Sequence, residues 1–260
     1  MHPLLFHLGK IAIPTYGVLT AVALLAALAV LVLQARRLGL RAEKVWNLGL
    51  VAILAALFGA RLLLVATHFA IFRAHPFWIL GLATVPGAWI AIGGAAIGVA
   101  AAALYALAEG LPLLRTADAA APAIVLAFAI NRVGAFCAGL DWGTPTSRPW
   151  GVTYRSVVAY LWYQTPLGVV LQPVQLYDAA ASLAIFALLL VLPHRRDGET
   201  VGAWLFLYGL CRFFLEFYRG NAEHVLGGAL TVAQLLSIAA VLAGGALWLR
   251  REARTAPVSV

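Results

Sequence analysis

Charged residues are scarce in this sequence. Only 11% of its 260 residues are Asp, Glu, Lys or Arg, against about 25% in an ordinary soluble domain, and 63% are hydrophobic. A soluble core cannot bury so large an apolar fraction, so the composition excludes an ordinary water-soluble domain. Several apolar runs of about 20 residues are each long enough to cross a bilayer core of about 30 Å. The sequence predicts an all-α polytopic membrane protein.

Clustered metal ligands and disulfide patterns are also lacking. The two cysteines, Cys137 and Cys211, stand in no CxxC or other metal-type spacing, and the six histidines form no HxxH or HExxH cluster. We therefore expect no disulfide framework and no zinc site. No convincing internal repeat and no low-complexity linker interrupts the chain, so residues 1–260 are expected to form a single integral membrane domain.

The basic residues predict an orientation in the membrane. About seven spans are predicted, at residues 14–34, 46–66, 86–108, 118–139, 173–193, 200–219 and 229–249. Ten of the 18 Lys and Arg lie on one face of these spans and five near the other. The positive-inside rule makes the first face cytoplasmic, so we expect the N-terminus outside and the C-terminus in the cytoplasm. No continuous basic groove with interleaved aromatic residues is present, so no nucleic-acid partner is expected.

The longest stretch outside the spans is residues 140–172. Its proline, glycine and aromatic content and two β-type runs, WGVTY and VVAYLWY, predict a small strand-containing cap. Because it lies between the fourth and fifth spans, the cap is expected on the periplasmic side.

Three arginines, Arg61, Arg132 and Arg212, fall inside predicted spans. An arginine at the centre of a membrane helix costs at least about 2.5–3.5 kcal/mol, so it normally faces a partner or a wet cavity. For Arg61 a structural pair with an acidic residue and a functional role are both open. Arg132 near the outer end of its span is equally compatible with a side chain that reaches the interface.

Polar residues recur at helical spacing in two other spans. Tyr208, Arg212 and Glu216 are four residues apart and share one helix face, and Arg219 follows Glu216 by three. An intrahelical ion pair without further function is the alternative interpretation. In the fifth span, Gln172, Gln175 and Asp178 lie three residues apart on one face.

Inward-facing arginines favour a phosphate, which they bind through bidentate hydrogen bonds. A phosphate reached from within the membrane belongs most naturally to a phospholipid headgroup. These residues therefore indicate an enzyme or a carrier of phospholipids, and the spacing alone does not choose between the two.

Four motifs in order resemble one family over essentially the whole chain: IPTYGVL, NRVGAFCAGLDWGTPTSRPWGVTY, QPVQLYD and YGLCRFFLEFYRG. They are similar to the prolipoprotein diacylglyceryl transferases. The resemblance implies transfer of the diacylglyceryl group of phosphatidylglycerol to the lipobox cysteine thiol of a preprolipoprotein, with release of glycerol 1-phosphate. This reaction is the first step of bacterial lipoprotein maturation and needs no metal or nucleotide, so the resemblance implies no cofactor. It also implies a multi-pass protein of the bacterial inner membrane, with its N-terminus periplasmic and its C-terminus cytoplasmic.

The resemblance also implies site residues. Arg132 and Arg212 would neutralise the phosphodiester and the charge that develops on the leaving glycerol phosphate, and Glu216 would orient Arg212 or contact the glycerol hydroxyls. The implied catalytic residues are Arg132, Arg212, Tyr208 and Glu216. The implied substrate-binding residues are Tyr16, Gly143, Gln172, Gln175, Asp178 and Arg219.

The chain departs from the family pattern at three positions. The family commonly has histidines where this sequence has Ile92 and Gln172, and an asparagine where it has Ala135. A thiol of ordinary pKa, about 8.5, must still lose its proton, so activation through Tyr208, Glu216, Asp178 or a water molecule is expected. The alternatives are a catalytically altered phospholipid-binding paralogue that acts on another acceptor and a lipid transporter, although no inverted repeat supports the latter.

Overall fold

Seven long helices form the body of the protein. The computed structural model describes residues 2–8, 11–75, 77, 88–222, 224–225 and 228–249, and within these ranges seven helices are long and apolar enough to cross a membrane. They are α1 (Thr15–Arg37), α2 (Ala42–Thr67), α4 (Ala88–Ala108), α5 (Leu113–Ala138), α7 (Val174–Val191), α8 (Glu199–Leu215) and α9 (Val232–Leu249). The predicted all-α polytopic fold is confirmed.

The helix ends differ from the predicted spans in two ways. At the basic end, α1 continues to Arg37 and α2 already begins at Ala42, because a helix satisfies its own backbone hydrogen bonds in water as well as in lipid. At the other end, α8 stops at Leu215 and tightens into the 3₁₀ turn η2 (Glu216–Tyr218), where a single span to residue 219 was expected.

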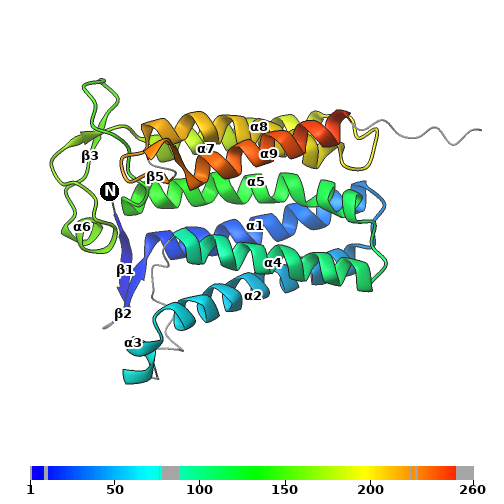
Figure 1. Ribbon diagram of the computed structural model, residues 1–260, viewed down its shortest axis with the longest axis horizontal. Helices are drawn as coiled ribbons and strands as arrows, with labels where there is room; N and C mark the ends of the chain where they lie inside the picture. The colour runs from blue at the N-terminus through cyan, green and yellow to red at the C-terminus, as the bar shows by residue number, and fades with distance from the viewer. Residues whose placement is uncertain are drawn as a thin grey trace, which may run out of the picture.

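Helix α5 runs through the middle of the bundle (Figure 1). The helices α7, α8 and α9 lie on one side of it and α1, α2 and α4 on the other. Helix α5 packs directly against α1, α7 and α8. Small residues let these helices approach closely. The fully buried alanines of α5 include Ala119, Ala121, Ala123, Ala129 and Ala135.

One end of the bundle carries the connections 38–41, 109–112 and 192–198 (Figure 1). There Lys44 Nζ lies 2.7 Å from Glu109 Oε2, which joins α2 to the end of α4. Asp118 on α5 accepts hydrogen bonds from the backbone N–H groups of Gly198 (2.6 Å) and Val201 (2.8 Å) at the start of α8. This carboxylate satisfies donors that the first turn of a helix leaves unpaired. The basic residues at positions 10, 250, 251 and 254 used to predict the orientation lie outside the described residues.

Short elements gather at the opposite end (Figure 1). The strands form three antiparallel pairs, β1 (Leu4–Leu8) with β2 (Ile11–Pro14), β3 (Val152–Thr153) with β4 (Val170–Leu171), and β5 (His224–Val225) with β6 (Leu230–Thr231). Two short helices, α3 (Phe69–Ala74) and α6 (Val157–Tyr163), accompany them.

The segment between α5 and α7 contains strands, as predicted, but only in part. WGVTY contributes β3, whereas the strand prediction for VVAYLWY is wrong, because this run forms α6. Every residue of this run is apolar, so its hydrophobic pattern shows neither the period of a strand nor that of a helix. Such a pattern does not distinguish a strand from a buried helix. In the structure Ala159 is buried, and Thr165 just beyond α6 donates a hydrogen bond of 2.8 Å to the Gly139 carbonyl at the end of α5.

Gly94 and Gly98 on α4 have the four-residue spacing of small residues that is typical of close helix packing, and α4 meets α2 there. A Cβ atom at Gly94 would lie 2.6 Å from the Cβ of Ala60 and 2.8 Å from the carbonyl oxygen of Ala56. By contrast, a Cβ atom at Gly245 in α9 would meet nothing within 4 Å.

We expect Gly94→Ala to lower the free energy of unfolding by about 1–3 kcal/mol, because the added methyl group pushes two helix backbones apart. The matched control Gly245→Ala should leave stability unchanged or raise it by about 0.5–1 kcal/mol, since alanine is the better helix former. Thermal unfolding of both purified variants in the same detergent measures the difference. Equal melting temperatures for the two variants would contradict the close packing of α2 and α4.

Candidate active site

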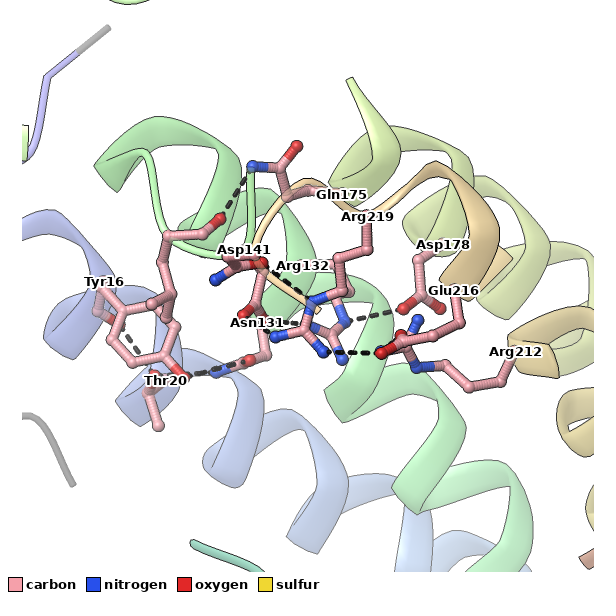
Figure 2. Close-up of polar contacts among 12 residues, drawn as sticks. Tyr16, Thr20, Asn131, Arg132, Asp141, Gln175, Asp178, Arg212, Glu216 and Arg219 are labelled. Atoms are coloured by element: carbon pink, nitrogen blue, oxygen red, sulfur yellow. Dashed lines mark hydrogen bonds and ion pairs between the residues drawn. The ribbon is translucent and has the colours of Figure 1, made fainter. Parts of the chain in front are cut away.

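Six charged side chains meet inside the bundle at the end that carries the 139–173 segment (Figure 2). Three are guanidinium groups and three are carboxylates, so their formal charges cancel. They come from three helices and from the turns that follow two of them. The six are Arg132 on α5, Asp141 just after α5, Asp178 on α7, Arg212 on α8, Glu216 in η2 and Arg219 just after η2.

Arg132 joins two of the carboxylates. Its Nη1 atom lies 2.7 Å from Asp141 Oδ2, and its Nε atom lies 2.8 Å from Asp178 Oδ2. The Asp178 side chain is only 4% exposed and the Arg132 side chain 21%. An isolated charge buried to this extent would destabilise the folded protein. The opposite charge of its partner therefore stabilises each of these groups in the bundle.

Arg219 and Glu216 extend this arrangement to Arg212. Arg219 contacts Asp141 Oδ1 through Nη2, and its Nη1 atom lies 3.5 Å from Glu216 Oε1. The other oxygen of Glu216 lies 2.6 Å from Arg212 Nη2. The six side chains therefore form one continuous network in which positive and negative groups alternate, in the order Asp178, Arg132, Asp141, Arg219, Glu216 and Arg212.

The local backbone explains the half of the network that comes from α8. Arg212 and Glu216 are four residues apart, which places their side chains one above the other at the end of the helix. The chain then tightens into η2, whose last N–H group, that of Arg219, donates to the Glu216 carbonyl at 3.1 Å. Arg219 therefore folds back toward the carboxylate of Glu216.

Gly143 lets the segment after α5 approach this turn. Its backbone pairs with that of Arg219 in an isolated β-bridge, and a Cβ atom at this position would lie 2.2 Å from the Gln172 carbonyl oxygen. No side chain fits there. Gly143 thus lies beside the network as a backbone position and contributes no chemical group.

Asp141 is absent from the predicted site residues. It follows the fourth predicted span, in the stretch assigned to the cap, although the LDWG motif places a carboxylate nine residues after Arg132. In the structure it adopts a positive φ of 55°, which aspartate tolerates better than most residues. Burial raises the pKa of Asp141, but Arg219 and Arg132 outweigh that effect and hold the pKa below its ordinary value.

A small cavity opens onto the network. Its lining consists of Arg132, Asp141, Val174, Gln175, Asp178, Arg212 and Arg219. Gln175 donates to the Leu140 carbonyl at 2.7 Å through Nε2, whereas its Oε1 atom and the Oδ1 atom of Asp178 are buried without a hydrogen-bond partner in the described residues. The cavity therefore combines arginine donors with unoccupied acceptors, a combination suited to a ligand that carries both a phosphate and hydrogen-bond donors.

Two predicted residues support the network from outside the cavity. The Tyr16 hydroxyl on α1 donates to Asn131 Oδ1 at 3.3 Å, and Asn131 donates to Thr20 Oγ1 at 2.9 Å, so the residue preceding Arg132 is tied to α1 (Figure 2). Tyr208 on α8 lies beside Arg132, and its ring packs against Phe128 with 5.1 Å between the ring centroids.

Gln172 does not join Gln175 and Asp178 at the cavity. It precedes α7, and its Oε1 atom accepts a hydrogen bond of 2.9 Å from the Tyr177 hydroxyl, which in turn accepts one from Trp150 Nε1 at 2.6 Å. Gln172 therefore links α7 to the 139–173 segment.

One group of side chains in the described residues has metal-ligand spacing, at the other end of the bundle. Ligand atoms of Asp118, His194 and Asp197 lie within 4.8 Å of one another. Asp118 already accepts two backbone hydrogen bonds, and Asp197 pairs with Arg115 Nε at 2.9 Å. These carboxylates thus have structural partners, and the group is separate from the arginine network.

Fold and site together define a polytopic membrane protein with a buried arginine–carboxylate centre near one end of its helical bundle. The chain belongs to the prolipoprotein diacylglyceryl transferase family, whose model matches residues 3–250. The resemblance drawn from the four sequence motifs is thereby confirmed.

Similar proteins cover nearly the whole chain. A protein of Geobacillus kaustophilus is 32% identical, and the match covers 95% of this chain and 92% of the relative. A Clostridium tetani protein is 28% identical over 94% of this chain and 95% of its own length, and one of Finegoldia magna is 30% identical over 92% and 91%. All three are named phosphatidylglycerol–prolipoprotein diacylglyceryl transferase.

The position of Asp141 predicts a pH-dependent loss of stability in Asp141→Asn. A carboxylate whose pKa is lowered by folding stabilises the protein above its unfolded pKa, about 3.9, and loses this effect as the pH falls through the folded value. We therefore expect Asp141→Asn to melt well below the wild type at pH 7, with the difference shrinking below about pH 4. Melting curves between pH 3 and 7 measure this dependence.

Asp197→Asn is the matched control, because Asp197 also pairs with an arginine but its side chain is 34% exposed. An exposed pair contributes about 0–1 kcal/mol, whereas removing one partner of a buried pair costs about 3–5 kcal/mol. If both variants shift the melting temperature equally at pH 7, Asp141 is not essential to a buried network.

Proposed function

We propose that this protein transfers the diacylglyceryl group of phosphatidylglycerol to the lipobox cysteine thiol of a prolipoprotein and releases glycerol 1-phosphate. Membership of the family and the shared name of its relatives support the reaction. The observation that carries the proposal within the structure is the cavity lined by three arginines inside an apolar bundle.

The arginines suit a phosphodiester bound at the level of the membrane. The Arg212 side chain is 11% exposed and that of Arg132 is 21% exposed, so a phosphate held there is largely shielded from water. In such surroundings charge-assisted hydrogen bonds are stronger than at an exposed surface. A phospholipid can present its phosphate at this depth while its acyl chains stay in lipid.

The same arginines favour the transferase reaction over simple binding. As the sulfur attacks the glyceryl carbon, the carbon–oxygen bond to the phosphate breaks and its electron pair leaves with the phosphate oxygen. The phosphate then carries two negative charges in place of one. Arg132 and Arg212, already positioned by Asp178 and Glu216, stabilise this developing charge in the transition state.

Of the remaining predicted residues, those on the cavity wall are assigned to substrate and the others to support. Gln175 and Arg219 line the cavity. The polar groups of their side chains are suited to hydrogen bonds with the phospholipid headgroup. Three residues support the network from outside the cavity. Tyr16 ties α1 to the residue before Arg132, Gln172 links α7 to the 139–173 segment, and Gly143 brings the loop after α5 beside Arg219.

We further infer that the protein lies in the bacterial inner membrane with its arginine network toward the periplasmic side. Apart from the three arginines inside the predicted spans, seven of the described Lys and Arg lie at the other end of the bundle and four near the network end, and the positive-inside rule makes the end with seven cytoplasmic. This orientation places the N-terminus and the cap at residues 140–172 in the periplasm, and the C-terminus in the cytoplasm. A lipobox cysteine that follows a translocated signal segment would reach the network from that side.

Complementation tests the function directly. In a strain depleted of its own diacylglyceryl transferase, expression of this chain should restore lipidation of a reporter prolipoprotein, read as a mobility shift and as incorporation of labelled phosphatidylglycerol acyl chains. If the chain accumulates in the membrane and binds phosphatidylglycerol but leaves the reporter unmodified, it is a phospholipid-binding paralogue that acts on another acceptor.

Substitution of the buried arginines should separate chemistry from folding. Arg132→Ala and Arg212→Ala are each expected to lower the lipidation rate at least about 10²-fold, because each removes a donor to the leaving phosphate.

The matched control is Arg61→Ala, since Arg61 lies outside the cavity lining and 5.3 Å from the ring centroid of Phe72. Activity is normalised to folded protein measured by size-exclusion chromatography. Wild-type turnover by folded Arg212→Ala would refute the phosphate-binding role, whereas Arg61→Ala should keep its activity per folded molecule.

A further inference from the structure

The three carboxylates of the network differ in how their oxygens are used. Asp141 pairs through Oδ2 with Arg132 and through Oδ1 with Arg219. Both oxygens of Glu216 also face guanidinium groups, at 2.6 and 3.5 Å. Asp178 differs, because its Oδ1 atom is buried without a hydrogen-bond partner in the described residues and the residue lines the cavity. Glu216 Oε2 also lacks a well-formed hydrogen bond, but it lies 2.6 Å from a guanidinium nitrogen and Glu216 is not part of the cavity lining.

The unused Oδ1 atom of Asp178 is buried, and Asp178 is one of the residues that line the cavity. The Oδ1 atom is inaccessible to solvent and accepts no hydrogen bond from the described residues, although the residue lines the cavity together with Arg132 and Arg212. In Figure 2 one oxygen of Asp178 is joined to Arg132 and the other is not joined to any side chain. A buried carboxylate oxygen without a donor is costly, which indicates that a ligand supplies the missing proton donor.

The other polar groups near the cavity are poorer proton acceptors. The Oε1 atom of Gln175 is also unpartnered, but an amide oxygen accepts a hydrogen bond without taking a proton. Tyr208 carries a phenol, which at neutral pH is a hydrogen-bond donor. None of the described histidines lines the cavity. Asp178 is the lining residue with both a negative charge and a free oxygen.

We propose that Asp178 is the general base that takes the proton from the attacking thiol, an inference that rests on the transferase function proposed above. The thiol proton passes to Oδ1 while sulfur bonds to the glyceryl carbon and the bond from that carbon to the phosphate oxygen breaks. The products are a thioether, a neutral Asp178 carboxyl and glycerol phosphate with two negative charges.

Charge balance favours this route. The six-residue network is neutral, so with a bound phosphodiester the site carries one negative charge before the reaction. Keeping the thiol proton on Asp178 leaves the total unchanged when the leaving phosphate gains its second charge. The departing glycerol phosphate, which now carries two negative charges, then takes this proton from the neutral Asp178 carboxyl. Asp178 returns to its charged form for the next cycle.

Arg132 positions the base and the leaving group together. Its Nε atom holds Asp178 Oδ2 at 2.8 Å, and it is also one of the arginines assigned to the phosphate. A phospholipid bound through Arg132 therefore has its reacting carbon close to Asp178 Oδ1. General bases act only from hydrogen-bond distance of the proton that they remove, and this shared arginine supplies that proximity.

The test uses purified full-length protein and two peptide substrates that carry cysteine or selenocysteine at the acceptor position. A selenol is already ionised at pH 7, whereas a thiol with a pKa of about 8.5 is not and needs a base. Asp178→Asn should lower kcat for both peptides, because it also removes the carboxylate that positions Arg132, but it should lower kcat for the cysteine peptide at least about 10²-fold more than kcat for the selenocysteine peptide. Binding of a short-chain phosphatidylglycerol confirms that the variant is folded.

Asp141→Asn is the control, because Asp141 also pairs with Arg132 but has no free oxygen. It should slow both peptides by the same factor. If Asp178→Asn also slows both peptides equally, or slows neither, Asp178 does not act as the base and the proposal is overturned. Should Asp178→Asn fail to fold, Asp178→Glu keeps the charge beside Arg132 and displaces the oxygen by one methylene. That variant must then lower the cysteine rate selectively.

The wild type separates this proposal from the function on which it rests. If wild-type protein modifies neither peptide with phosphatidylglycerol present, the transferase function itself fails. If it modifies both peptides and only the Asp178 variants give the wrong ratio, the function stands and the assignment of the base is wrong.

Discussion

Three buried arginines must be neutralised inside an apolar bundle, and the rest of the structure follows from how this is done. Each guanidinium group contacts a carboxylate from a different segment, so α5, α7, η2 and the loop after α5 are held together by charge as well as by packing. Because removing one partner leaves an uncompensated charge in the bundle, the network specifies how these segments meet. The backbone bridge between Gly143 and Arg219 lies where the network brings the turn after α5 and the turn after η2 into contact.

Neutrality in the ligand-free state also makes the site ready for an anion. A phosphodiester brings one negative charge, and the guanidinium groups can turn hydrogen-bond donors toward it without leaving their carboxylates, since arginine has five N–H donors. Arg132 contacts Asp178 through Nε and Asp141 through Nη1 and also interacts with Tyr208, and its remaining N–H donors can turn toward a ligand. The carboxylates therefore act as fixed counterions that orient the arginines before substrate arrives, so little reorganisation is needed in the transition state.

Residues on regular helices were predictable from the sequence, and residues defined by turns were not. The four-residue spacing of Arg212 and Glu216 predicts their contact, since helix geometry alone decides it. Arg132 and Asp178 attract attention because charges are rare in apolar spans. Their mutual contact depends on how α5 packs against α7, which no local spacing reveals. Asp141 lies in a turn with positive φ, where neither period nor burial can be read from the neighbouring residues. The strand prediction for the residues of α6 was wrong because the run is uniformly apolar and has no hydrophobic period to read.

The two ends of the bundle use the same kinds of side chain with different physical effect. Lys44 with Glu109 and Arg115 with Asp197 are partly exposed pairs that join neighbouring segments, and pairs of this kind contribute little free energy to stability. At the other end, Asp178 and Glu216 are almost completely enclosed, so each unsatisfied oxygen or N–H group carries a large free-energy cost. A ligand that satisfies such groups binds more tightly. If the charge of the ligand changes during the reaction, the same contacts can stabilise the transition state. Asp118 at the other end is also buried, but two backbone N–H groups satisfy it. Buried carboxylates that pair with arginines around a cavity therefore distinguish the end that we propose binds the substrate.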